Sequence, residues 1–174
     1  MNHIKKVMGL VLVIGAFITN ANAQATASST ASATIVAPIT ITNTVPMVFG
    51  NLAVTSTSGT VILSAAGGRT ATGGVTLPAT SSGSPTAAAF TVGGEGAYTY
   101  TITLPSSVTL TKSGGGATMT VDQFTCSIST AVGGGQLTSG AQNFTVGATI
   151  GVASGQAAGA YTSLTPFNVT VNYN

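Results

Sequence analysis

Few side chains of this sequence have types suited to chemistry. Its 174 residues include two acidic side chains, Glu95 and Asp122, and one cysteine, Cys126. The one histidine, His3, lies in a segment that we expect to be removed, so the mature chain has none. Without histidine, Ser-His-Asp and Cys-His catalytic arrangements cannot form. A lone thiol cannot build a structural zinc site. We therefore predict no metal site and no cofactor.

The two carboxylates are the remaining candidates for catalysis, as a glycosidase-type pair. Glu95 lies in a glycine-rich, hairpin-like loop (residues 93–96), whereas Asp122 lies in a run with strand composition. General acid–base catalysis needs a tuned group held in a polar cleft. We expect both acids to be solvated or paired with Arg69 or Lys112, and we expect that the protein is not an enzyme.

Cys126 has two interpretations. Phe124 and Ile128 share its parity, which predicts a small hydrophobic residue on a buried strand face. The alternative is a reactive thiol or an intermolecular disulfide, because an exported chain with one cysteine has no partner of its own.

Residues 1–23 have the composition of a secretory signal peptide. A positively charged start precedes an apolar run over residues 7–18, and Ala21-Asn22-Ala23 reads as a cleavage site. The apolar run is short for a transmembrane helix. We expect export to the periplasm, the cell surface or the medium. The mature chain, residues 24–174, has 174 − 23 = 151 residues, a length that suits one domain.

The mature chain is almost free of charge. Only Arg69, Lys112, Glu95 and Asp122 remain, so its side-chain net charge is 2 − 2 = 0. Two cations cannot follow a phosphate backbone or bind an anionic membrane surface, which excludes nucleic acid as a partner and an electrostatic role at a membrane surface. A net charge near zero favours association between copies.

Short runs with strand composition alternate with glycine-rich turns about every ten residues. Together with the N-terminal arm (residues 24–42) they give about ten strands: 47–54, 60–64, 74–77, 88–92, 98–104, 108–111, 118–127, 143–152 and 163–173. This pattern predicts one all-β domain, a sandwich or a barrel, with no substantial helix outside the signal peptide.

The N-terminal arm alternates with a period of two, as a strand with one buried face does. The apolar parity comprises Ala31, Ala33, Ile35, Ala37, Ile39 and Ile41, which form the candidate assembly strand. An uncharged strand of this kind either pairs within its own domain or adds itself to the sheet of a neighbour.

The end of the chain alternates as regularly. Phe167, Val169, Val171 and Tyr173 fall on one parity, with asparagine and threonine between them. This run is either an ordinary closing strand or an edge that a chaperone or a neighbouring subunit engages.

Several motifs occur in a fixed order along nearly all of the mature chain. They are residues 33–41, Phe49-Gly50, and residues 68–75, 100–105, 146–148, 156–161 and 169–173. In this order they resemble the bacterial domain-of-unknown-function family 4402. The resemblance implies no particular biochemical activity.

Residues 26–38 are also similar to the N-terminal donor strand of chaperone–usher fimbrial and capsular subunits. In those immunoglobulin-like pilins the arm completes the sheet of the next subunit, and Tyr173 resembles a residue of the C-terminal strand that their chaperones hold. This likeness implies an immunoglobulin-like antiparallel β-sandwich. It also implies copies of the chain, a periplasmic chaperone and outer-membrane assembly machinery as partners.

We therefore expect a structural surface protein, a fimbria- or capsule-like subunit that assembles by β-strand donation. The alternative is a monomeric adhesin or glycan-binding sandwich that presents Tyr98, Tyr100 and Asn143. The two tyrosines share a parity with Ile102, and their hydroxyls are expected to reach water at a strand end.

Overall fold

The computed structural model describes residues 23–174, so nearly all of the predicted signal peptide (residues 1–22 of 1–23) lies outside the described part. The chain divides after Thr34 into an N-terminal unit and a domain of residues 35–174. Within the N-terminal unit, residues 23–34 have no regular secondary structure. Within the domain, the first strand begins at Thr40, after Pro38, which has no N–H to offer a strand partner.

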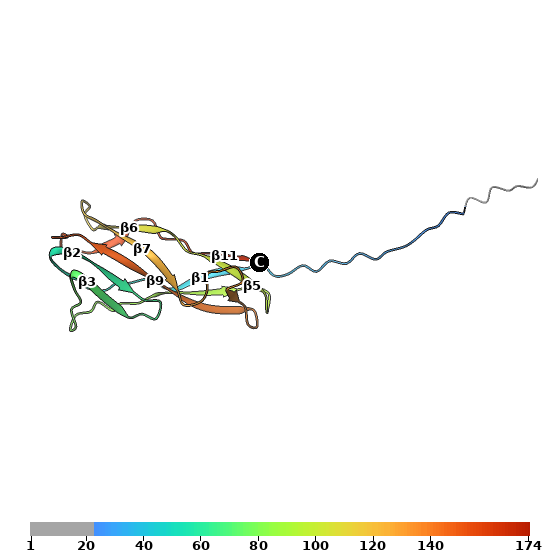
Figure 1. Ribbon diagram of the computed structural model, residues 1–174, viewed down its shortest axis with the longest axis horizontal. Coiled ribbons are helices and arrows are strands. Elements are labelled where there is room, and N and C mark those ends of the chain that lie inside the picture. Colours follow the sequence, from blue (N-terminus) through green and yellow to red (C-terminus); the bar gives the residue numbers. More distant parts are fainter. Residues whose placement is uncertain (1–22) are drawn as a thin grey trace, which may run out of the picture. The chain divides into compact units, whose positions relative to one another are not determined.

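The domain is built from strands alone, as the alternation and the glycine-rich turns predict (Figure 1). The strands are β1 (Thr40–Val45), β2 (Ala53–Leu63), β3 (Arg69–Thr76), β4 (Ala88–Gly93), β5 (Thr99–Thr103), β6 (Ser107–Lys112), β7 (Thr118–Cys126), β8 (Gly135–Gln136), β9 (Ala141–Val152), β10 (Tyr161–Ser163) and β11 (Thr170–Tyr173).

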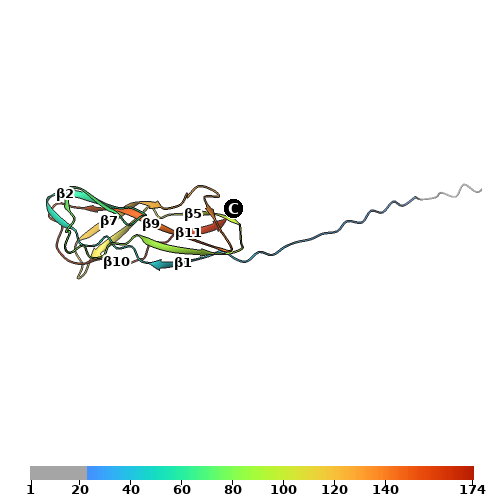
Figure 2. The same ribbon diagram turned by 90° about the horizontal axis from the view of Figure 1, so that it is seen from below.

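These strands form two antiparallel sheets. The larger sheet has the order β1-β4-β9-β7-β6-β10, and the hairpin of β2 and β3 joins it through β9; the smaller has the order β11-β5-β8. Figure 1 places β5 and β11 at one end of the domain and β2, β3 and β6 at the other. Figure 2 shows β1 running from the first end toward the second, where β10 lies. The fold is consistent with the expected β-sandwich.

Strand β9 connects the two ends of the domain. Residues 141–146 pair with β4, and residues 148–152 pair with β2. On the opposite edge, residues 146–150 pair with β7. Alternate residues of a strand share one face, and the even-numbered residues of β9 from Phe144 to Val152 are all buried.

This face of β9 contributes to two hydrophobic cores. The first core comprises Ala88, Phe90, Val92, Tyr100, Ile102, Leu137, Phe144, Val146 and Val171. The second core comprises Phe49, Val61, Leu63, Val75, Val121, Ala148, Ile150 and Val152. Phe90 and Phe144 lie opposite each other in the ladder and stack with ring centroids 5.4 Å apart, an arrangement that adds to the burial.

Two strand predictions were wrong, and proline or glycine explains each. Residues 47–54 are not one strand: Val48 makes an isolated bridge to Thr86, and β2 begins only at Ala53. Gly50, with φ +75°, turns the chain between them. Residues 163–173 form two strands because the chain around Pro166 cannot continue a ladder.

We predict that Ile150→Ala lowers the free energy of unfolding by about 2–5 kcal/mol, because it leaves a cavity in the second core. Denaturant unfolding followed by circular dichroism measures the loss. Ile62→Ala is the matched control, since Ile62 lies on the neighbouring β2 and is 44% exposed. It should cost less than about 1 kcal/mol. Equal losses in the two variants would contradict the packing described here.

Candidate functional site

The structure divides the six residues of the candidate assembly strand. Ile39 and Ile41 pack against the first core of their own domain, and β1 pairs with β4. Ala37 is exposed, and Ile35 is 97% exposed. Ala31 and Ala33 belong to the N-terminal unit and lie in no strand. The part of the arm before Pro38 therefore belongs to no strand of its own domain.

The base of the arm is held at Ala37. Its N–H donates to Glu95 Oε2 at 3.3 Å, and its carbonyl oxygen accepts from the Tyr173 hydroxyl at 3.1 Å. The same hydroxyl accepts from the Glu95 N–H at 2.7 Å. A Cβ at Gly94 would collide with this hydroxyl, so the glycine makes room for the arrangement. We call these three residues, Ala37, Glu95 and Tyr173, the arm anchor.

Sequence reasoning missed the arm anchor, because its members are 58 and 136 residues from Ala37 along the chain. Glu95 is exposed in its loop, as expected, and its carboxylate also accepts from the Ala37 backbone amide. Arg69, the expected cation, donates to the carbonyl oxygens of Phe49 and Asn51. Asp122 lies in β7, opposite Ser107.

The candidate partner edge at the C-terminus lies partly in a strand: Val171 and Tyr173 belong to β11, whereas Phe167 and Val169 precede it. Val171 is buried opposite Ile102 of β5, whereas Asn172 is exposed, which confirms the alternation there. Phe167, Val169 and Tyr173 are half-buried against the first core. Among the described strands β11 pairs only with β5, so its second edge carries no strand.

The second core is open on one side. A groove with a volume of about 920 Å³ runs between residues 47–54 and residues 156–163. We call it the groove. Its floor includes the half-buried side chains of Val108, Leu110 and Met119, from β6 and β7, which pack against the buried second core. None of the described residues that line it carries a charge.

Hydrogen bonds hold both walls of the groove in place. On one wall, Arg69 Nη1 donates to the Phe49 carbonyl oxygen at 2.7 Å. On the other, the Gln156 amide donates to the Thr118 carbonyl oxygen at 3.1 Å and to the Tyr161 hydroxyl at 2.8 Å. Walls tied in this way give the groove a shape that exists before anything binds.

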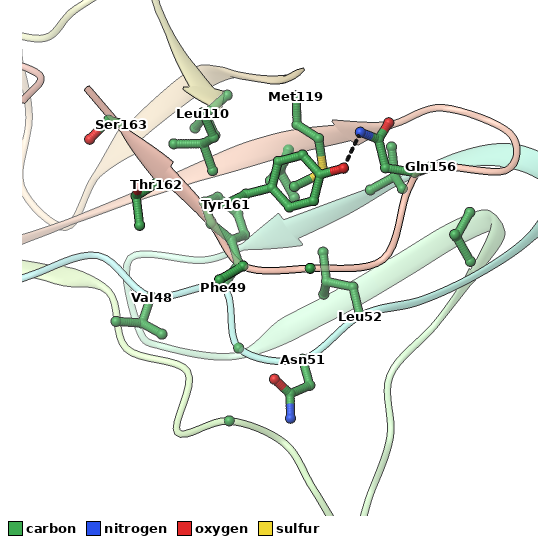
Figure 3. Close-up of a pocket in the computed structure, with 18 of the residues that line it drawn as sticks. Val48, Phe49, Asn51, Leu52, Leu110, Met119, Gln156, Tyr161, Thr162 and Ser163 are labelled. Carbon is green, nitrogen blue, oxygen red and sulfur yellow. Dashed lines mark hydrogen bonds between the residues drawn. The ribbon is translucent and has the colours of Figure 1, made fainter. Parts of the chain in front are cut away.

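The close-up in Figure 3 shows how the side chains of the groove are directed. Leu110, Met119 and Tyr161 lie together on one side, and Leu52 faces toward them, whereas Asn51 points away. The strand beside them, β10, pairs only with β6 among the described strands, so its other edge is open. The groove thus combines a half-covered apolar floor with an open strand edge.

A model of the protein family described as Domain of unknown function (DUF4402) matches residues 39–173. The chain belongs to this family. The matched region begins at Ile39 and includes both cores and the groove, whereas Ile35 and the residues before it lie outside the match. No curated protein and no solved structure matches the chain. No helix within residues 23–174 of this DUF4402 chain is long and apolar enough to cross a membrane.

One of the three residues expected to bind glycan, Tyr100, is not accessible in this DUF4402 domain. Tyr100 is fully buried, and its hydroxyl donates to Gln142 Oε1 at 2.8 Å, so the expectation that it reaches water was wrong. Tyr98 is 42% exposed and packs on Tyr173. Asn143 accepts from the Thr91 hydroxyl on the exposed side of β9. The three side chains therefore do not form one polar platform.

Burial also governs the chemistry of Tyr100 and Cys126. It raises the pKa of Tyr100 to about 12, and negative charge on Cys126 adds to the rise. Burial likewise raises the pKa of the Cys126 thiol. Backbone hydrogen bonds at Ile128 and Ser127 lower this pKa and partly offset the rise. Cys126 packs with Phe124 and Ile128 against the first core, as their shared parity predicts. A raised thiol pKa disfavours the reactive thiolate.

We predict that Tyr173→Phe loosens the arm anchor of the DUF4402 domain, because it removes both hydrogen bonds of the hydroxyl. Each is worth about 0.5–1.5 kcal/mol. Amide exchange at Glu95 and Ala37, measured by NMR, should become about tenfold faster. Tyr98→Phe is the control and should leave exchange unchanged, since it keeps the Tyr173 hydroxyl. Unchanged exchange in Tyr173→Phe would show that these bonds do not hold the arm.

We predict that alkaline pH destabilises the domain through Tyr100. Above its ordinary pKa of 10.0 the side chain ionises in the unfolded chain but stays protonated in the fold up to about pH 12. The unfolded state therefore binds fewer protons, and the free energy of unfolding falls from pH 10 to pH 12. Denaturant unfolding at several pH values measures this slope. Tyr100→Phe should lack this part of the slope; an equal slope in both proteins would contradict the assignment.

Proposed function

We propose that this DUF4402 chain is an exported structural protein of the cell surface, a fimbria- or capsule-like subunit that assembles by donating its arm to a neighbouring copy. One observation carries the proposal: Ile35, on the apolar parity of the arm, is 97% exposed. An aliphatic side chain in water, on an uncharged segment with strand periodicity, has the properties of a strand that pairs outside its own domain.

The energetic balance supports self-association. Burying an isoleucine side chain stabilises a contact by about 1.5–3 kcal/mol, and each small alanine adds roughly 0.8 kcal/mol for its methyl group. Backbone pairing along the strand adds register. The mature chain has a net side-chain charge of 2 − 2 = 0, so copies do not repel one another over distance.

The same surfaces supply a reason for helper proteins during export. An open strand edge and a half-covered core invite wrong pairing before the subunit reaches its neighbour. We propose that a periplasmic chaperone covers such a surface until outer-membrane machinery brings two subunits together. The edge of β11, which includes Val171 and Tyr173, is a candidate contact for it, together with Phe167 and Val169, which precede the strand on the same parity.

The test compares two charge substitutions on opposite parities of the arm. Ile35→Asp places an acid on the apolar parity and should weaken assembly about 10- to 150-fold, the loss that corresponds to about 1.5–3 kcal/mol. Thr34→Asp adds the same charge on the polar parity and should change assembly less than about threefold. The readout is the subunit number in material from cells that express the full-length chain, by mass photometry and negative-stain microscopy.

Circular dichroism of both variants checks that the domain stays folded. Two results would refute the proposal. One is mature protein that stays monomeric at high concentration in the presence of its export machinery. The other is assembly that Ile35→Asp and Thr34→Asp reduce equally.

A further inference from the structure

We infer that the groove is the acceptor site of the assembly: it binds the arm of a second copy as a strand along the open edge of β10, with Ala31, Ala33 and Ile35 on its floor. The inference rests on the proposed function and names the surface at which it takes place. Four observations carry it, concerning the floor, the edge, the charge and the reach of the arm.

The floor of the groove lacks a cover. Val108, Leu110 and Met119 are only half-buried, although they lie directly against the buried side chains of the second core. A strand laid over these three residues would remove their remaining surface from water. Every second side chain of that strand would face the floor, and the others would face solvent. The arm has this alternation, with alanine and isoleucine on one parity and serine and threonine on the other.

The edge of β10 offers backbone partners for such a strand. Tyr161 lies opposite Lys112 and Ser163 opposite Leu110, and the Ser113 N–H donates to the Ala160 carbonyl oxygen. In an antiparallel ladder, hydrogen-bonded and non-hydrogen-bonded pairs alternate. Ala160 and Thr162 therefore point their backbone groups at β6, whereas Tyr161 and Ser163 point theirs away from it. Those groups can pair with an added strand.

The uncharged lining of the groove favours an uncharged segment as its occupant. No residue that lines the groove is acidic or basic, and burying a charge there without a partner would be costly. Residues 24–38 are free of charged side chains. The Ala31 and Ala33 side chains are also small, so the donated backbone can approach the large side chains of the floor closely.

The reach of the arm favours a second copy as its acceptor. The anchor at Ala37 lies three residues before β1, and the groove begins near Met47, ten residues after Ala37. At about 3.3 Å per residue, an arm that turned back would use about 33 Å to reach its own groove. Residues 24–36 span about 43 Å, so about three residues would remain. A wall of eight residues, about 26 Å long, needs more than that.

Disulfide trapping between two differently labelled copies tests the site. All proteins are full-length chains that carry Cys126→Ala. Donor chains carry Ser32→Cys or Thr34→Cys on the polar parity of the arm, and acceptor chains carry Thr162→Cys on β10. Neighbouring strands bring such residues within disulfide distance. The matched control acceptor is Thr70→Cys, at an exposed threonine on β3, a strand that pairs only with β2 among the strands described.

Donor and acceptor are co-expressed, and a mass tag on the acceptor separates the mixed dimer from dimers of like chains. We expect at least tenfold more mixed dimer with Thr162→Cys than with Thr70→Cys for one of the two donors. Assemblies that form without this preference would overturn the groove as the acceptor and leave the proposed function standing. Absence of assemblies in all samples, and in the Cys126→Ala parent, would overturn the proposed function together with the inference.

Discussion

The even-numbered residues of β9, from Phe144 to Val152, share one face that both hydrophobic cores bury. Because a strand turns alternate residues to the same side, this one segment sets the register for β4, β2 and β7 together. A slip of one residue would turn this face outward. The two ends of the domain therefore depend on the same ladder. A shift in its register would expose the buried face of β9 at both ends.

The two cores are covered to different degrees. The first core is covered by the smaller sheet, with Ile102 and Val171 packed in it. The second core has the β2–β3 hairpin on one side, but Leu110 and Met119 remain half-exposed along the groove. Because the mature chain has almost no charge, electrostatic repulsion does not keep the exposed apolar surfaces of two copies apart. The proposed donation of an equally uncharged strand would cover this surface.

Local patterns in the sequence predict most of the fold and little of the candidate site. The run 143–152 lies within β9, and the alternation at Val171 and Asn172 holds, because burial on one face dictates both. The site depends on contacts between distant residues, such as the hydrogen bond from Tyr173 to Ala37, which no local pattern records. Tyr100 shows the same limit: its hydroxyl was expected to reach water, and only the fold brings Gln142 to it as a buried partner.

The arm anchor also decides how the domain bears mechanical load. Tension along the arm enters at Ala37 and continues into β1, which runs alongside β4 over five paired positions from Thr40 to Val45. Force directed lengthwise along a strand shears all of its ladder bonds together, whereas force across a strand opens them one after another. A pull applied at this point and directed along β1 would load the ladder in the stronger of these two directions.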